Sequence, residues 1–341
     1  MASARLYGSD RAREIHRDAP AIDLHADPLI MARYVGYDLN KRHSPPLPFG
    51  ALFGHTDVPR MQDGGVGAQF FGLVAMPKLP LDRDLNGTCH RQIDLLERAI
   101  AQSDGRLVLA RSGDDVRAAA ARGTIGALIG LEGAHNLLGS LEQLERFARR
   151  GLRYLGLLHF SANECGAPAK GLGSDASRGL TAFGRSVVER CEQLGVIVDL
   201  AHINERGFFD ACEIARKPVI VSHTGVAGVF PMWRNITDDQ LCAVANKGGV
   251  VGIIFCPRFL GRDGVEAVAD HILHVTRVAG EDTPALGSDW DGFIRPTRGL
   301  EEASKLPNLT DALLARGVTR SALEKILRLN ALRVLDAVAP Q

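Results

Sequence analysis

The stretch Val250-Val251-Gly252-Ile253-Ile254-Phe255 is apolar at almost every position. A strand with one solvent-facing side alternates apolar and polar residues, whereas a strand of a parallel sheet is covered on both faces and is apolar throughout. The shorter run Val219-Ile220-Val221 has the same character. Both stretches therefore predict buried strands that pair in parallel with their neighbours.

Eight short apolar runs of this kind follow one another along the chain, at residues 19–25, 66–75, 125–131, 153–159, 195–201, 218–222, 249–255 and 284–288. Between most of them lie helical patterns with apolar residues at i, i+3 and i+4, at residues 90–102, 140–150, 180–194, 205–216, 264–279 and 320–337. Thr237-Asp238-Asp239-Gln240 resembles a capping box and predicts one more helix start. Because strands that alternate with helices pair in parallel, the sequence predicts one α/β domain over residues 1–341, a (β/α)8 TIM-like barrel.

An open, doubly wound sheet is the alternative fold. The first strand-to-helix turn has no GxGxxG pattern, which disfavours the dinucleotide-binding version of that sheet. The longest non-periodic segment, residues 44–65, is rich in Pro and Gly and predicts a long loop after the first strand. This loop is either a surface insertion or a lid, because loops that follow barrel strands overhang the active-site face.

Composition excludes several classes of partner. The chain has 341 residues, and 40 Lys and Arg balance 40 Asp and Glu, so no net field attracts nucleic acid or an anionic membrane. Residues 1–11 lack the apolar core of a signal peptide, and no apolar stretch approaches the ~20 residues that span a bilayer. The six cysteines are scattered without CxxC spacing, which predicts reduced thiols and a cytoplasmic protein. The choice between a monomer and a homodimer is left open.

Potential metal ligands stand where the predicted strands end. His25 and Asp27 lie two residues apart, so their side chains point the same way from a strand and can hold one divalent cation. Similar residues follow five later runs, namely Glu132, His159, His202, His223 and Asp289. The carboxyl ends of barrel strands converge on one face, where catalytic residues collect.

The ligand types favour zinc, although Mn²⁺ and Fe²⁺ accept the same imidazole and carboxylate groups. One catalytic zinc usually has three protein ligands and an open position. Five ligands are therefore too many for one ion, and about the right number for two ions that share a carboxylate. Two such ions, about 3.5–4 Å apart, can stabilise a hydrolytic transition state.

Stretches throughout the chain resemble the membrane (renal) dipeptidase family, peptidase family M19, a zinc peptidase group of the amidohydrolase superfamily. They are Asp23-Leu24-His25-Ala26-Asp27, Val66-Gly67-Ala68-Gln69-Phe70, Leu131-Glu132-Gly133-Ala134-His135, Gly151-Leu152-Arg153-Tyr154-Leu155 with His159, Gly179-Leu180-Thr181-Ala182-Phe183-Gly184, Val198-Asp199-Leu200-Ala201-His202, Val221-Ser222-His223, Arg234-Asn235-Ile236-Thr237-Asp238-Asp239 and Gly287-Ser288-Asp289-Trp290-Asp291-Gly292. The resemblance runs in order from about residue 19 to residue 336.

The resemblance implies a barrel with two Zn²⁺ ions that hydrolyses free dipeptides through a hydroxide bridging the metals. Carried over position by position, it implies that His25 and Asp27 bind one ion and that His202 and His223 bind the other. Glu132 would bridge the two ions. The resemblance also implies tolerance of a D-residue at the C-terminal position, and β-lactam hydrolysis as a side activity.

Three further roles follow from the same resemblance. Asp289 would be the acid/base that moves the proton of the attacking water, with Asp291 as its rival in the same turn. His159 would polarise the scissile carbonyl. Arg234 would bind the terminal carboxylate of the substrate; without the resemblance it is interpreted as a solvated residue before a helix cap.

The sequence departs from the family pattern around the predicted pocket. Residues 161–168 replace a Trp-Ala-Asp-like segment, and Phe255-Cys256-Pro257 replaces a segment with a tyrosine. Before the last helix, Arg328-Leu329-Asn330 stands in place of Gly-Gly-Asn. The side-chain preference is therefore left open. The alternatives to a dipeptidase are another amidohydrolase reaction, on a lactone or cyclic amide, and a non-catalytic metal-binding barrel.

Overall fold

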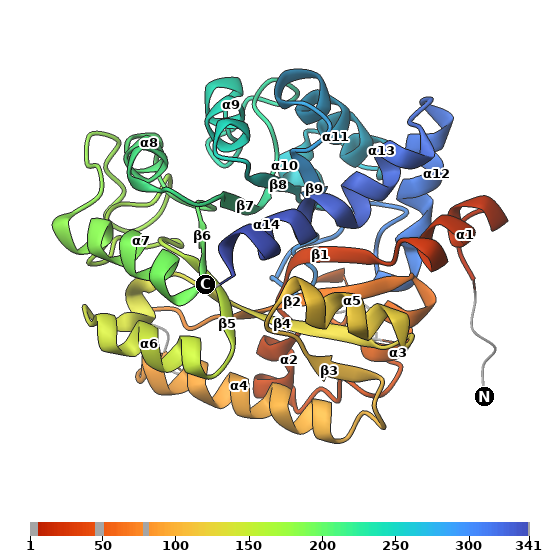
Figure 1. The fold of residues 1–341 in the computed structure, drawn as a ribbon, viewed down its shortest axis with the longest axis horizontal. Helices are drawn as coiled ribbons and strands as arrows, with labels where there is room; N and C mark the ends of the chain where they lie inside the picture. Colours follow the sequence, from red (N-terminus) through yellow and green to blue (C-terminus); the bar gives the residue numbers. More distant parts are fainter. Residues whose placement is uncertain (1–5, 45–50, 78–81, 340–341) are drawn as a thin grey trace.

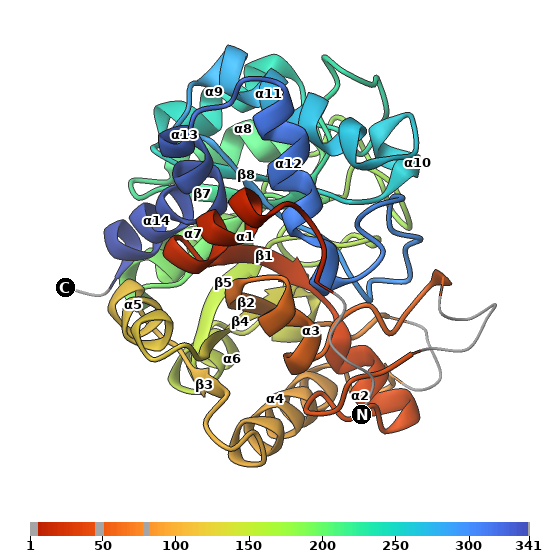
Figure 2. The ribbon, with the colours of Figure 1, turned by 90° about the vertical axis from the view of Figure 1, so that its right-hand side faces the viewer.

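The computed structural model describes residues 6–44, 51–77 and 82–339, and its strands close into a parallel barrel surrounded by helices (Figures 1 and 2). The strands are β1 Ala21–Ala26, β2 Val66–Leu73, β3 Leu107–Leu109, β4 Ile125–Glu132, β5 Leu152–Gly156, β6 Ile197–Asp199, β7 Val219–Thr224, β8 Val250–Ile253 and β9 Pro284–Leu286. β1 pairs with both β2 and β9, β2 also pairs with β4, and β4 to β9 pair in sequence. The ring therefore closes, which confirms the predicted barrel and excludes the open sheet.

Each of the eight predicted apolar runs contains one strand of the ring or overlaps it. The ninth strand, the three-residue β3, was not predicted. β3 pairs with Ile125–Ala127 at the start of β4, whereas β5 pairs with Ile129–Glu132 at its end. β3 thus pairs with the amino-terminal part of β4, before the residues of β4 that pair with β5. The ring of eight strands is therefore left intact.

The helices cover the outside of the ring (Figure 1). They are α1 Asp10–Asp18, α2 Pro28–Val35, α3 Val58–Asp63, α4 Leu85–Ala101, α5 Gly113–Ala121, α6 Leu141–Arg149, α7 Ala182–Leu194, α8 Glu205–Ile214, α9 Asp238–Asn246, α10 Pro257–Leu260, α11 Val265–Ala279, α12 Pro307–Ala315, α13 Arg320–Glu324 and α14 Asn330–Val338, with a π-helical turn at Lys325–Leu329 and short 3₁₀ turns at Ala134–Leu137 and Ala303–Lys305. The six predicted helical patterns correspond to α4, α6, α7, α8, α11 and the combined α13–α14. α9 begins after Thr237 with a complete capping box, as predicted.

The barrel interior is apolar in the half that lies towards the amino-terminal ends of the strands. All eight strands of the ring contribute to one buried cluster, through Ile22, Leu24, Ala68, Phe70, Leu128, Tyr154, Ile197, Ile220, Val250 and Ala285. Most of these residues lie in the first half of their strands, and Ala331, Leu335 and Val338 of α14 join the same cluster. α14 therefore closes the amino-terminal end of the barrel, and the polar residues are left at the carboxyl ends of the strands.

The connection from β1 to β2 contains both α2 and α3, and α3 lies inside the segment 44–65 that was predicted as non-periodic. Residues 45–50 of this segment lie outside the described residues. All six cysteines are free thiols, as predicted. Within the described ranges, no helix combines the length and the apolar character needed to cross a membrane.

Candidate active site

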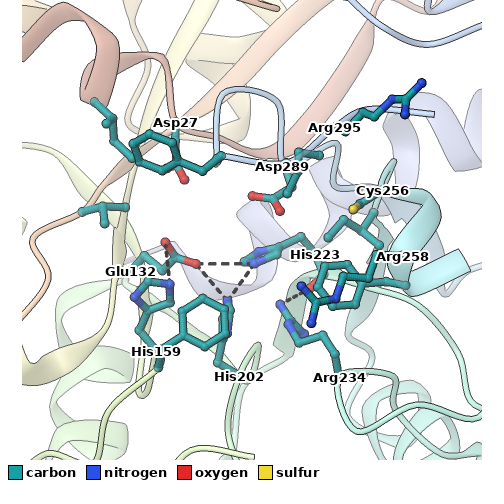
Figure 3. A pocket seen from close by; sticks show the side chains of 18 of the residues that line it. Asp27, Glu132, His159, His202, His223, Arg234, Cys256, Arg258, Asp289 and Arg295 are labelled. Carbon is teal, nitrogen blue, oxygen red and sulfur yellow. Dashed lines mark hydrogen bonds and ion pairs between the residues drawn. The ribbon is translucent and has the colours of Figure 1, made fainter. Parts of the chain in front are cut away.

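A cavity of about 570 Å³ opens at the carboxyl ends of the strands (Figure 3). Seven of the eight predicted site residues line it, namely Asp27, Glu132, His159, His202, His223, Arg234 and Asp289. The eighth, His25, is fully buried at the end of β1, and its Nε2 atom lies 3.5 Å from Asp27 Oδ2 and 3.7 Å from Asp289 Oδ1. The barrel thus brings together residues that are up to 264 positions apart, as His25 and Asp289 are.

Glu132, the last residue of β4, is at the centre of this group. Its Oε1 atom lies 3.0 Å from His202 Nε2, 3.4 Å from His223 Nε2 and 3.8 Å from His25 Nε2. The Nε2 atoms of His202 and His223 are themselves 2.9 Å apart, so both imidazoles face the same point. His159 approaches the other carboxylate oxygen, with Nε2 3.6 Å from Glu132 Oε2.

Three sets of side chains are spaced so that each could hold a metal ion. They are His25 with Glu132 and His223, Glu132 with His159 and His202, and His25 with Asp27 and Asp289. Glu132 belongs to two of the sets and His25 to two, so neighbouring sites would share ligands. By distance alone, His159 is therefore also a candidate metal ligand, in the set that it forms with Glu132 and His202.

The ionisation of the group favours a bound cation. Burial raises the pKa of Glu132 well above its usual value, and burial raises that of Asp289 to about 7. Burial lowers the pKa of His202 and of His223 far below the usual range, so both imidazoles are neutral and keep a lone pair for a metal.

His25 behaves in the opposite way. Burial lowers its pKa, but the carboxylates of Asp27, Glu132 and Asp289 attract a proton to it and raise the pKa to about 10. Buried Asp27 Oδ1 also has no hydrogen-bond partner among the residues that the structure describes. Three buried carboxylates that compete for one imidazolium fit a site that is completed by divalent metal ions.

Two glycines make room for this group. A Cβ atom on Gly72 of β2 would lie 2.0 Å from Asp27 Oδ1, so only glycine leaves space for that carboxylate. A Cβ atom on Gly130 of β4 would lie 2.0 Å from Tyr154 Cζ, so the phenol ring rests directly against the β4 backbone. The Tyr154 hydroxyl is 2.6 Å from His25 Nδ1, and this hydrogen bond orients Nε2 towards the carboxylates.

One serine directly precedes His223 and another directly precedes Asp289. Each serine is hydrogen-bonded to its own buried aspartate, which lies on a neighbouring strand. Asp199 accepts hydrogen bonds from Ser222 N (2.8 Å) and Ser222 Oγ (2.6 Å), and Ser222 Oγ is 2.9 Å from His223 Nδ1. Asp23 accepts from Ser288 N and Oγ at the same two distances. Sequence reasoning did not assign a role to these supporting residues or to Tyr154, although Asp23, Tyr154, Asp199, Ser222 and Ser288 all stand within the motifs quoted above.

Asp289 and Asp291 both have positive φ angles, 60° and 68°, but they face different surroundings. Asp289 lines the cavity, whereas Asp291 is fully buried and accepts hydrogen bonds from the backbone N–H groups of Gly54, His55 and Thr56 and from the Thr56 hydroxyl. Of the described residues of segment 44–65, none lines the cavity. Asp291 thus attaches that segment to the β9 turn.

Arg234 lies in the loop between β7 and α9 and is buried, with 4% of its surface exposed. Its Nη2 atom donates a hydrogen bond to the backbone oxygen of His223 at 2.7 Å. Figure 3 shows its guanidinium group beside this oxygen at the lower right of the cavity. Arg234 is therefore a cavity residue and not the solvated residue that the sequence left as an alternative.

We expect Tyr154→Phe to weaken metal binding without unfolding the protein. The variant keeps the ring against Gly130 and removes only the hydroxyl that orients His25, and the loss of such a supporting hydrogen bond typically costs about 10–100-fold in metal affinity. Zinc affinity is measured by competition with a chromophoric chelator, and thermal unfolding of the metal-free variant serves as the control. An unchanged zinc affinity would show that the hydroxyl does not support the metal ligand.

Asp291→Asn should destabilise the protein by about 1–3 kcal/mol, because its amide NH₂ would face hydrogen-bond donors in the buried segment at Gly54–Thr56. The matched control is Asp289→Asn, which makes the same change in the same turn but on the cavity side. Urea unfolding of both metal-free variants provides the comparison. Equal destabilisation by the two substitutions would contradict a supporting role that is specific to Asp291.

Comparison with known proteins adds to this geometry. Residues 9–340 match the family described as membrane dipeptidase (peptidase family M19). The chain is 34% identical over 330 residues to dipeptidase tcpJ of Claviceps purpurea, covering 93% of this chain and 76% of that protein. It is also 34% identical over 342 residues to an uncharacterized dipeptidase of Schizosaccharomyces pombe, covering 95% and 82% of the two chains.

Two solved structures share the fold closely. One is a metallopeptidase from Rhodobacter sphaeroides, solved with a phosphinate mimic of the dipeptide L-Ala-D-Ala, which has 27% identity and a TM-score of 0.81. The other is a metallopeptidase of the same M19 family, dipeptidase AC, with 28% identity and a TM-score of 0.82. In both cases the match covers 94% of this chain and 99% of the other chain.

Proposed function

Because the chain belongs to the membrane dipeptidase family and is a metallo-dipeptidase, we propose that it hydrolyses the single amide bond of free dipeptides with two zinc ions bound around Glu132. The observation that carries this proposal is the position of Glu132, whose carboxylate faces imidazoles from β1, from β7 and from the loop after β6 at once. Arg234 lines the same cavity and supplies a buried cation for a substrate carboxylate.

In this proposal, His25 and Asp27 bind one ion, His202 and His223 bind the other, and Glu132 binds both. The donor set of imidazole and carboxylate groups suits zinc, and Mn²⁺ or Fe²⁺ would accept it too. When bound, the ions would polarise the amide carbonyl and lower the pKa of a coordinated water from 15.7 to about 7.

The chain's own residues supply the remaining chemistry. Asp289 lines the cavity and has a pKa raised by burial, so its carboxylate can accept the proton of the attacking water and return it to the departing amine. Burial keeps His159 neutral, and a neutral imidazole can donate a hydrogen bond to the carbonyl oxygen as negative charge develops there.

Arg234 would fix the position of the substrate. A guanidinium group binds a carboxylate through two parallel hydrogen bonds, so it would select the free C-terminal end of a dipeptide. The hydrogen bond from Arg234 to the His223 backbone holds the group at a set position relative to the metal ligands.

We also propose that the enzyme accepts a D-residue at the C-terminal position. A site that recognises the carboxylate, and makes few demands at the Cα atom, distinguishes the two configurations weakly. The Rhodobacter sphaeroides relative was solved with a mimic of L-Ala-D-Ala, which supports this extension.

The direct test is a screen of L-Xaa-L-Xaa and L-Xaa-D-Xaa dipeptides with zinc- or manganese-loaded protein, in which ninhydrin detects the released amino acids. We expect turnover of dipeptides in both series. No turnover across the whole panel would contradict the proposed function, and hydrolysis of lactones or cyclic amides in its place would identify another amidohydrolase reaction.

Arg234→Ala should lower kcat/KM for L-Ala-L-Ala by about 100-fold, because a buried, charge-assisted pair with the substrate carboxylate is lost. The same variant should change the hydrolysis of L-Ala-L-alaninamide far less, because that substrate has no terminal carboxylate. Arg298→Ala is the matched control, since Arg298 is an exposed arginine near the mouth that does not line the cavity. An equal loss for both substrates would show that Arg234 acts on the fold and not on the carboxylate.

A further inference from the structure

Two more arginines line the cavity at its mouth, Arg258 in α10 and Arg295 after β9. Both are exposed, and the structure gives neither guanidinium group a hydrogen bond or ion pair with any residue in the described ranges. Asp263 is the one acidic lining residue outside the candidate active-site residues, and its carboxylate already accepts from Thr297 Oγ1 (3.0 Å) and from the Arg298 backbone (2.7 Å). Two guanidinium groups and one carboxylate leave the described residues of the mouth with a net positive charge.

Arg258 is held next to Arg234 by contacts between their neighbours in sequence. Asn235 Nδ2 donates a 2.8 Å hydrogen bond to the backbone oxygen of Phe259. The ring of Trp233 meets the ring of Phe259 edge-on, with 6.2 Å between the centroids. Residues on both sides of Arg234 thus contact the residue that follows Arg258.

The two mouth arginines, Arg258 and Arg295, differ in their position relative to Arg234. Figure 3 shows Arg234 and Arg258 on the same side of the cavity, whereas the guanidinium group of Arg295 points away from the Glu132 cluster. If Arg234 binds the α-carboxylate of a dipeptide, Arg258 is the cation placed closest to the side chain of that C-terminal residue. The α-carboxylate of the substrate balances the charge of Arg234 and leaves Arg258 without an anionic partner.

We propose that Arg258 binds a carboxylate on the side chain of the C-terminal residue, so that the enzyme prefers dipeptides ending in Asp or Glu. This inference rests on the proposed function, because it uses Arg234 to set the position of the substrate. The N-terminal residue is a poor candidate for the acidic group, because its ammonium group is repelled by both arginines. The ammonium is better placed near Asp27 and Asp289, which line the part of the cavity opposite Arg234 in Figure 3.

The exposure of Arg258 determines how strong the preference should be. A charge-assisted hydrogen bond favours the acidic substrate over its neutral amide by about tenfold when it is partly shielded from water. Salt screens an exposed pair, so the preference should decline as ionic strength rises and the Debye length falls from about 10 Å at 0.1 M to about 3 Å at 1 M.

The experiment compares kcat/KM for L-Ala-L-Asp and L-Ala-L-Asn on metal-loaded protein, since these substrates have the same shape and differ in one charge. We expect an Asp/Asn ratio of about 10 for the natural sequence. Arg258→Gln should bring the ratio to about 1 by lowering the value for L-Ala-L-Asp, and should change the value for L-Ala-L-Asn by less than about twofold. Arg258→Lys, which keeps the charge without the planar fork, should give an intermediate ratio.

The matched control is Arg295→Gln, which removes the same charge from a mouth side chain that points away from the Glu132 cluster and should leave the ratio near 10. An equal fall of the ratio in both variants would assign the preference to the general field of the mouth and overturn the role of Arg258. A ratio near 1 for the natural sequence, with L-Ala-L-Asn turned over, would overturn the inference and leave the dipeptidase function intact. No turnover of any dipeptide would instead contradict the proposed function itself.

Discussion

The buried carboxylate of Glu132 is the constraint on which the rest of the site depends. It ends β4 with its Oε1 atom within 3.8 Å of three histidines, from β1, from β7 and from the loop that follows β6, and the carboxylates of Asp27 and Asp289 approach the same Nε2 atom of His25. Burying a carboxylate costs several kcal/mol of free energy unless a positive charge lies close to it. In the protein alone that charge is provided by a proton on His25, whose pKa is raised to about 10. Burial also raises the pKa of Glu132 and of Asp289, so these carboxyl groups take up protons as well, and bound divalent ions would replace the protons as the balancing positive charge.

Such a site has to be rigid before a metal arrives, and the strand ends show how this is achieved. Asp23 connects β1 to the residue before Asp289, and Asp199 connects β6 to the residue before His223, with the same pair of hydrogen bonds in each case. Each aspartate bonds both the backbone and the hydroxyl of a serine, so it fixes the start of the turn that carries the next site residue. The strain of a positive φ at Asp289 is held by these contacts on one side and by Asp291 on the other.

The ring and the site residues at the strand ends were predictable from sequence for a physical reason, whereas Arg234, which lies in a loop, was singled out only by the family resemblance. Strands covered on both faces must be apolar, so runs such as 250–255 stand out, and a polar residue directly after such a run has few structural explanations. The supporting contacts were not predictable, because Tyr154 reaches His25 only through the curvature of the barrel and the space left by Gly130. Asp289 and Asp291 have identical side chains two positions apart, and only the three-dimensional path of segment 54–56 tells which one faces the cavity. The alanine-rich α5 lacked the large apolar residues that make a pattern visible, and β3, although apolar, is only three residues long.

The cavity is built from two kinds of structure, and Arg234 connects them. Its inner part consists of strand ends and carries the candidate metal ligands, whereas its mouth consists of α10 and of the loops around Trp233 and Phe293. Residues on loops can change without disturbing the barrel, so substrate preference at Arg258 can vary while the metal chemistry stays fixed. Arg234 lies on a mouth loop but donates its hydrogen bond to the backbone of His223, a strand-end residue. A carboxylate bound by Arg234 is therefore positioned by the same strand that presents a candidate metal ligand, whichever side chain the mouth selects.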